Sequence, residues 1–210
     1  MFKNKITSIE ELRTHYAQPG KVSLQKQRPS LDQNSRDFIA LSPFVLIATS
    51  NAEGRCDVSP KGDKPGFVRA LDEKHLLIPD RPGNNRLDSL ANLLENPNIG
   101  LIFLIPGRGD TLRVNGKAWI VTDEDLLESM IAEGKKPKTA IGVEAVEVYL
   151  HCPKAFMRSG LWKPDTWPLE NSIPTMCEML WNQLPEKPAG VADLKEYEAA
   201  MQERLGQTLY

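Results

Sequence analysis

Short runs rich in β-branched and aromatic residues follow one another closely through the middle of the chain. Runs of this kind, bounded by glycine, proline and asparagine, are typical of β-strands. Because most of them are joined in hairpin order with one helix inserted, they predict a small antiparallel barrel, mainly β with flanking helices. We expect six to seven strands, at residues 44–49, 56–59, 67–71, 75–79, 99–105, 111–121 and 140–150.

Apolar residues at helical spacing predict helices on both sides of the barrel and within it. The length of 210 residues suits one domain with its own core, so we expect a single domain, 1–210. It comprises an N-terminal helical segment (1–42), the barrel (43–150) and a C-terminal segment (151–210) with a helical tail that packs on the barrel or on a partner subunit. Helices are expected at 7–16, 31–41, 86–96, 123–132, 174–184 and 192–205, with irregular chain at 18–30.

Composition argues against several classes of protein. A nucleic-acid binder would need a strongly basic balance, and the net charge is -2. No apolar run approaches the ~20 residues of a membrane span, and the N-terminus lacks the apolar region of a signal peptide. The three cysteines are odd in number and lack metal-type spacing, so we expect reduced thiols in a cytoplasmic protein and no metal site.

The stretch from Asp57 to Phe67 is charged and rich in glycine and proline, although it lies between two apolar runs. Glycine lets a backbone approach a ligand closely, and proline fixes the direction of approach. The Ser59 hydroxyl and the Lys61 ammonium lie beside that backbone. The stretch therefore indicates a ligand site, and the alternative is a long hairpin turn with charged decoration.

A second polar stretch leaves a strand at Pro79-Asp80, turns through Pro-Gly and enters a helix at Asn84, Asn85 and Arg86. A helix N-terminus offers unpaired N–H groups and the positive end of the helix dipole. Together with an arginine this favours an anion site, most naturally for a phosphate. The alternative is that one asparagine only caps the helix and that Arg86 is solvated.

A third set alternates along a predicted strand, which places Arg113, Asn115 and Lys117 on one face. A solvated edge strand is the alternative. The sequence offers no catalytic triad, no paired carboxylates and no nucleotide-binding glycine motif. Phosphate-binding and cationic groups in a β-barrel instead suit a phosphorylated cofactor that brings its own chemistry.

Several long motifs occur in one order between residues 30 and 165, and together they resemble the pyridoxamine 5'-phosphate oxidase-related family. Within that family the sequence is most similar to a subfamily of FMN-dependent bacterial proteins. The motifs are Asp57-Val-Ser-Pro-Lys-Gly-Asp-x-Pro-Gly-Phe-Val68, Ile78-Pro-Asp-Arg-Pro-Gly-Asn-Asn-Arg-Leu-Asp-Ser-Leu90, Leu112-Arg-Val-Asn-Gly-Lys-Ala118, His151-Cys-Pro-Lys-Ala155 and Arg158-Ser-x-Leu-Trp162.

The resemblance implies a split β-barrel that forms a homodimer and holds FMN between its subunits. It also implies four groups of cofactor-binding residues. One strand would follow the flavin ring, the turn that begins at Pro79-Asp80 would take the phosphate, a further strand would approach the dimer seam, and a C-terminal segment would reach the partner's flavin. The residues of the four groups are, in that order, Asp57, Val58, Ser59 and Lys61; Asn84, Asn85 and Arg86; Arg113, Asn115 and Lys117; and Arg158, Ser159 and Trp162.

Departures from the family's vitamin B6 oxidases change the expected reaction. Those enzymes carry Arg-x-Val-Leu-Leu-Lys and Ser-Arg-Lys motifs, where this chain has Cys56-Asp-Val-Ser-Pro-Lys61 and Asn84-Asn-Arg86, and their C-terminal Arg-x-His is not recognisable. We expect an FMN-dependent oxidoreductase for a small molecule or reduced nicotinamide, with Lys61 or Arg113 stabilising reduced flavin. The alternatives are a flavin-binding, flavin-storing or redox-sensing protein without efficient turnover, and a barrel that binds haem or the deazaflavin F420.

Overall fold

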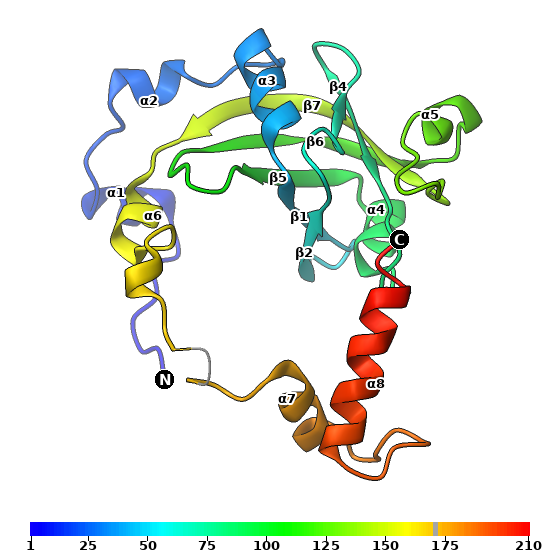
Figure 1. Cartoon of the computed structure of the whole chain (residues 1–210). Coiled ribbons are helices and arrows are strands. Elements are labelled where there is room, and N and C mark those ends of the chain that lie inside the picture. The colour runs from blue at the N-terminus through cyan, green and yellow to red at the C-terminus, as the bar shows by residue number, and fades with distance from the viewer. Residues whose placement is uncertain (170–171) are drawn as a thin grey trace.

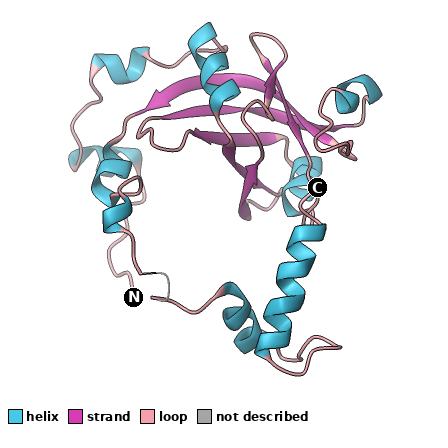
Figure 2. Cartoon of the chain, in the orientation of Figure 1, coloured by secondary structure: helices cyan, strands magenta, loops and turns pink. Residues whose placement is uncertain are grey.

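A single antiparallel sheet of seven strands forms the centre of the computed structural model, which describes residues 1–169 and 172–210 (Figure 1). The strand order is β2-β1-β5-β6-β7-β4-β3, so β2 and β3 are the two edges of an open, split barrel. This arrangement, with helices around it (Figure 2), confirms the expected fold class. The strands are β1 (Phe44–Ser50), β2 (Cys56–Gly62), β3 (Arg69–Ala70), β4 (His75–Pro79), β5 (Asn98–Leu104), β6 (Thr111–Val121) and β7 (Ala140–His151).

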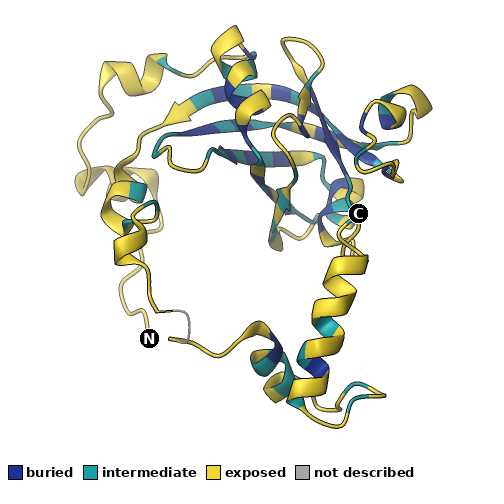
Figure 3. Cartoon of the chain, viewed as in Figure 1, coloured by how far each residue is buried: buried dark blue, intermediate teal, exposed yellow. Residues whose placement is uncertain are grey.

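The main core lies on one face of the curved sheet, where every second side chain of β1 and β5 is buried. On β1 and β5 these side chains include Val45, Ile47, Leu101 and Phe103, all fully buried. Helix α3 (Gln33–Leu41) adds Phe38 and Ile39 to the same cluster. Figure 3 shows this buried layer in the central strands, whereas the N-terminal segment and the last helices are mostly exposed.

Strand β2 corrects the prediction for the central polar stretch, because it does not end at Ser59 but continues through Pro60 and Lys61 to Gly62. Proline cannot donate to a ladder and is therefore confined to edge strands, and β2 is an edge. The strand expected at 67–71 is reduced to Arg69–Ala70. Phe67 and Val68 are nevertheless buried in the core.

Helices differ from expectation mainly at their ends and outside the barrel. An unpredicted helix, α2, lies in the stretch expected to be irregular, and α6 was also not predicted. Helices α1, α2 and α6 bury no residue, and Ile9 on the expected apolar face of α1 is 67% exposed. The remaining bounds are α1 (Ile9–Thr14), α2 (Lys21–Gln25), α4 (Asp88–Glu95), α5 (Glu124–Glu128), α6 (Lys154–Ser159), α7 (Met176–Gln183) and α8 (Leu194–Gln207), with a 3-10 turn at Pro164–Thr166.

The C-terminal helices form a small unit of their own before the chain returns to the barrel. Trp181 of α7 and Tyr197 of α8 pack with ring centroids 5.7 Å apart, and Cys177 is buried beside them. From there α8 runs back toward α4, so that its last residues lie beside the sheet (Figure 1). None of the helices in the described residues has both the length and the apolar character of a membrane span.

Candidate functional site

A cavity of about 770 Å³ lies beside the edge strand β2. It is enclosed by β2, the turn between β4 and α4, the start of α4, the loop after α5, and the end of α8. Among its lining residues are Asp57, Val58, Ser59, Pro60, Lys61, Asp80, Arg81, Asn84, Asn85, Asp88, Ser89, Lys135, Lys136, Lys138, Arg204, Thr208 and Tyr210.

Alternation along β2 places Asp57, Ser59 and Lys61 on one face, since they pair with Thr49, Ile47 and Val45 of β1. Lys61 Nζ donates to Asp80 Oδ1 at 3.2 Å, and both side chains are 22% exposed. Strand geometry and this ion pair therefore fix the Lys61 ammonium against the cavity rather than in solvent.

Helix α4 is held against the strands that carry the site. Ser89 Oγ donates to Asp57 Oδ2 at 3.2 Å, and Asn92 Nδ2 donates to Thr49 Oγ1 at 3.0 Å. Ser89 and Thr49 are both buried. These two hydrogen bonds hold α4 against β2 and β1, and the bond from Ser89 fixes Asp57 at the cavity wall.

The predicted phosphate turn differs from expectation in its detail. Helix α4 begins at Asp88, so Asn84, Asn85 and Arg86 precede the helix. The helix has no side-chain cap, and the reading of Asn84 or Asn85 as its cap is therefore wrong. The Asn84 side-chain oxygen instead accepts from the Arg86 backbone N–H at 3.0 Å, and Asn85 has a left-handed φ of 56°.

Arg86 does not line the cavity in this structure. Asn84 and Asn85 line the cavity, whereas Arg86 is 72% exposed and its Nε lies 2.8 Å from Asp88 Oδ2. The hydrogen bond to Asp88 raises the pKa of Arg86 and lowers that of Asp88. Pro79 is buried at the end of β4 and does not line the cavity, while Asp80 does.

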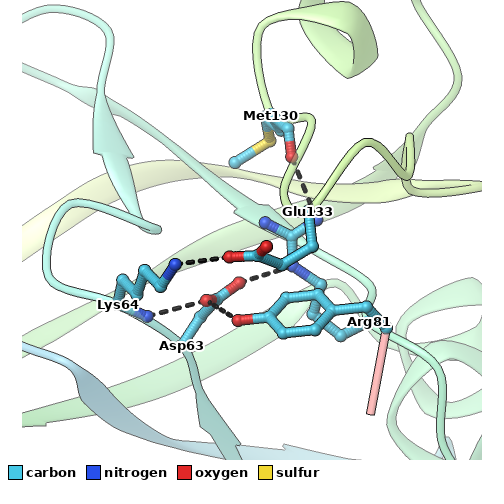
Figure 4. Close-up of polar contacts among 6 residues, drawn as sticks. Asp63, Lys64, Arg81, Met130 and Glu133 are labelled. Carbon is cyan, nitrogen blue, oxygen red and sulfur yellow. Dashed lines mark hydrogen bonds and ion pairs between the residues drawn. The ribbon is translucent and has the colours of Figure 1, made fainter. Parts of the chain in front are cut away.

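Asp63, just beyond β2, is a buried carboxylate with several donors around it (Figure 4). Its side chain is 4% exposed and accepts from Arg81 Nε at 2.7 Å and from the Lys64 backbone N–H at 2.7 Å. Arg81 also donates to the Met130 carbonyl oxygen at 2.9 Å. Burial would raise the pKa of Asp63, but the hydrogen bonds from Tyr210, Lys64 and Arg81 hold it below its ordinary value.

Tyr210 joins the end of α8 to this cluster. Its hydroxyl donates to Asp63 Oδ1 at 2.6 Å, and the Arg81 guanidinium lies 6.0 Å from the centre of its ring. Lys135 donates to the Tyr210 backbone oxygen. The loop after α5 and the end of α8 are thereby held together as one wall of the cavity.

Sequence reasoning missed this wall altogether. The basic run Lys135-Lys-Pro-Lys138 was a visible signal, but nothing local connects it with β2 or with Arg204 in the last helix. Tertiary contacts bring these segments to the cavity, and those of Tyr210 join the end of α8 to the loop and to Asp63.

Two other predicted groups lie outside the cavity of their own chain. Arg113, Asn115 and Lys117 share one face of β6, as expected, but on the side opposite the buried Leu112 and Val114. There Arg113 donates to the Tyr149 hydroxyl at 2.9 Å, and Asn115 donates to Glu147.

The predicted C-terminal group, Arg158, Ser159 and Trp162, also lies outside the cavity. Arg158 and Ser159 end helix α6, and Trp162 Nε1 donates to the Arg108 carbonyl oxygen at 2.6 Å. The Trp162 ring stacks on Phe156 with centroids 5.7 Å apart. Across residues 1–169 and 172–210, no three His, Cys, Asp or Glu side chains converge as a metal site would require.

Comparison with known proteins gives a family match and several structural similarities. The family model described as pyridoxamine 5'-phosphate oxidase matches residues 31–152. No curated protein matches the sequence.

Among solved structures, similarity extends to HupZ of Group A Streptococcus, at 20% identity, with 56% of this chain and 91% of that chain covered and a TM-score of 0.46. An FMN-binding protein from Syntrophomonas wolfei has 14% identity, coverages of 56% and 83%, and a TM-score of 0.43. The heme storage protein HutZ of Vibrio cholerae has 14% identity, coverages of 58% and 93%, and a TM-score of 0.43. At these TM-scores the similarities decide neither ligand nor reaction.

Proposed function

The chain belongs to the pyridoxamine 5'-phosphate oxidase family, and we propose that it is an FMN-dependent oxidoreductase acting on a small molecule or a reduced nicotinamide. The family match confirms the resemblance seen in the motifs. The observation that carries the proposal is Lys61, held by Asp80 at a cavity of about 770 Å³ beside an open sheet edge. That volume lies within the roughly 300–1,000 Å³ typical of ligand pockets.

The residues around the cavity fit a flavin. As an edge strand, β2 has backbone N–H and C=O groups that no neighbouring strand uses, and these can bind the polar edge of the ring. Lys61 supplies a positive charge close to that edge, which favours the anionic reduced form over the neutral oxidised form. When bound, FMN supplies the acceptor for a hydride or for electrons.

The turn at Asn84, Asn85 and Arg86 supplies donors for the phosphate. Asn84 and Asn85 already line the cavity. Arg86 must leave Asp88 to reach it, but exposed ion pairs contribute little net stability, so this exchange costs little. A phosphate dianion is the stronger acceptor for a guanidinium.

We also propose that the functional unit is a homodimer. Helices α1, α2 and α6 bury no residue within the chain, which leaves apolar side chains such as Val22 and Met157 exposed. Helices of soluble proteins are normally stabilised by packing an apolar face. The groups around Arg113 and Arg158 lie outside the cavity of their own chain, as expected for residues that serve a partner's site.

The absorption spectrum of the purified protein tests the cofactor. A flavin spectrum supports the proposal, and a haem Soret band in its place contradicts it. Addition of NADH or NADPH to the yellow protein should bleach it faster than it bleaches free FMN. Bound flavin that no donor reduces would instead indicate a binding, storage or sensing protein.

Light scattering of the flavin-loaded protein tests the dimer. We expect twice the chain mass and an interface larger than the ~1,600 Å² of a standard complex, since both terminal segments contribute. A stable monomer with full FMN occupancy would show that the site needs no partner.

A further inference from the structure

One wall of the cavity carries positive charge that the described residues do not neutralise. The lining includes six cationic side chains but only three carboxylates. Of the wall residues, Lys136 is paired with Glu124 and Glu128, and Lys135 donates to the main-chain oxygen of Tyr210. Through their side chains, Lys138 and Arg204 form no ion pair or hydrogen bond within residues 1–169 and 172–210.

The carboxylates of the cavity are not available to these cations, because each already has a partner. Asp80 is paired with Lys61, Asp88 with Arg86, and Asp57 accepts from Ser89. Among the described residues that line the cavity, the side chains of Lys138 and Arg204 are left without an ion pair or hydrogen bond, and Asp57 has only the neutral donor Ser89. At the wall, Lys138 and Arg204 therefore present two unpaired positive charges, which suits a dianion.

Contacts on both sides hold this wall in place. Lys138 precedes Thr139, whose carbonyl oxygen accepts from the Asp80 backbone N–H at 3.0 Å, so the loop lies directly beside the Lys61–Asp80 pair. Pro137 on its other side is buried. Arg204 lies six residues before Tyr210, whose hydroxyl is fixed on Asp63. Neither cation is on a free chain end or an unanchored loop.

We propose that Lys138 and Arg204 form a second phosphate subsite, which binds the pyrophosphate of a reduced nicotinamide dinucleotide that donates electrons at this cavity. The inference rests on the proposed function. The phosphate of FMN is the other source of the same chemistry, but the turn at Asn84–Arg86 already provides for it. Such a subsite holds the donor equally in the ground state and the transition state, so it sets KM rather than kcat.

Binding of inorganic pyrophosphate to the FMN-loaded protein, measured by calorimetry, tests the subsite directly. Lys138→Gln and Arg204→Gln should each weaken pyrophosphate binding about 10-fold, and raise KM for the dinucleotide by a similar factor with kcat unchanged. The matched control is Lys195→Gln, an exposed cation at the other end of α8 that does not line the cavity. The control should match the wild type in both measurements.

The affinities for FMN and riboflavin separate the two sources of phosphate. If the proposal holds, both variants bind FMN and riboflavin as the wild type does. Weaker binding of FMN but not of riboflavin would assign Lys138 and Arg204 to the cofactor and overturn the proposal. Unchanged pyrophosphate binding in both variants would overturn it as well.

Failure of the proposed function gives a different result. A protein that takes up no flavin contradicts the oxidoreductase, yet the same pyrophosphate titration on that flavin-free protein still measures the subsite. Loss of pyrophosphate binding in Lys138→Gln and Arg204→Gln, but not in Lys195→Gln, would then support the anion subsite and overturn its assignment to an electron donor for FMN.

Discussion

Lys61 on β2 and Asp80 just beyond β4 form an ion pair, with Nζ and Oδ1 3.2 Å apart, that connects opposite ends of the sheet order. Strand β2 is one edge of the sheet, and β4 is next to the other edge. A second ion pair, between Asp63 and Arg81, joins the same two segments a short distance beyond the ends of β2 and β4. Side-chain charges thus bridge the open barrel here and leave the outer backbone groups of β2 available to a ligand.

The Lys61–Asp80 pair predicts opposite changes in the midpoint potential of bound FMN. Lys61→Met removes a positive charge beside the ring and should lower the potential, whereas Asp80→Asn leaves Lys61 uncompensated and should raise it. The shifts should be a few tens of millivolts, since about 30 mV corresponds to 1.4 kcal/mol for a two-electron couple. Spectroelectrochemical titration measures them.

Lys64→Met is the matched control, because Lys64 lies three residues further on but is 77% exposed and pairs with Glu133. It should leave the potential unchanged. Equal potentials in Lys61→Met and the wild type would show that Lys61 is only a structural partner of Asp80.

Asp63 should be important for stability, because its carboxylate and the Arg81 guanidinium are 4% and 16% exposed. Asp63→Asn leaves Arg81 without its counter-charge, and breaking a buried pair in this way costs about 3 kcal/mol. For a chain of this size the midpoint of thermal unfolding should fall by about 6–12 °C. Asp88→Asn, which breaks an exposed pair, should hardly change it.

The hydrogen bond from Tyr210 predicts how Asp63 responds to pH. Tyr210→Phe removes one of the donors that lower the Asp63 pKa, so this pKa should rise toward its ordinary value of 3.8. A lowered pKa contributes stability that is complete above pH 3.8 and is lost as pH falls through the folded-state value. In Tyr210→Phe the gap between the two pKa values narrows, so the loss of stability below pH 3.8 should be smaller and should be complete at a higher pH than in the wild type.

Carboxyl NMR of Asp63 gives the pKa, and urea unfolding between pH 6 and 3 gives the stability. Faster amide exchange in the last turn of α8 should accompany the change, since Tyr210 anchors that turn. An Asp63 pKa equal to that of the wild type would show that Tyr210 does not contact the carboxylate in solution.

The barrel could be predicted from sequence because most of its strands can be recognised from a few neighbouring residues. The apolar runs of β1 and β5, and the β-branched content of β6 and β7, are visible within a few residues of sequence. The same local reasoning ended β2 too early, because only its position at a sheet edge makes Pro60 acceptable in a strand. Whether a strand lies at the edge of a sheet depends on how all the strands pair, which a short stretch of sequence does not show.

The candidate site was predictable on one side only. Asp57 and Ser59 alternate on the predicted strand, and the resemblance to the family placed Lys61 on the same strand, so this side of the site could be predicted. The wall of Lys138 and Arg204 depends on contacts between residues far apart in the chain, such as Tyr210 with Asp63, and no local pattern encodes them. For Arg86 the local motif predicted a ligand contact, but in the structure its side chain pairs with Asp88.

Gly116 on β6 should not tolerate a side chain. The pairing between β6 and β7 shifts register between Asn115 and Gly116, and a Cβ on Gly116 would lie 2.0 Å from the Glu144 carbonyl oxygen. A backbone atom cannot rotate away, so Gly116→Ala should cost about 3 kcal/mol of unfolding free energy. Gly206→Ala, in open space on α8, should instead gain about 0.5 kcal/mol. Urea denaturation compares the two, and similar stabilities would contradict this register.

Arg86 provides the sharpest test of the phosphate turn, because its side chain does not yet contact the cavity. If it moves from Asp88 to the phosphate on binding, Arg86→Ala should weaken FMN about 10- to 100-fold and leave riboflavin, which has no phosphate, nearly unchanged. Asp88→Asn frees Arg86 and removes a nearby negative charge, so it should tighten FMN without affecting riboflavin. Fluorescence quenching titrations measure all four affinities. Equal losses for FMN and riboflavin in Arg86→Ala would assign Arg86 a structural role and leave the phosphate to Asn84, Asn85 and the backbone of the turn.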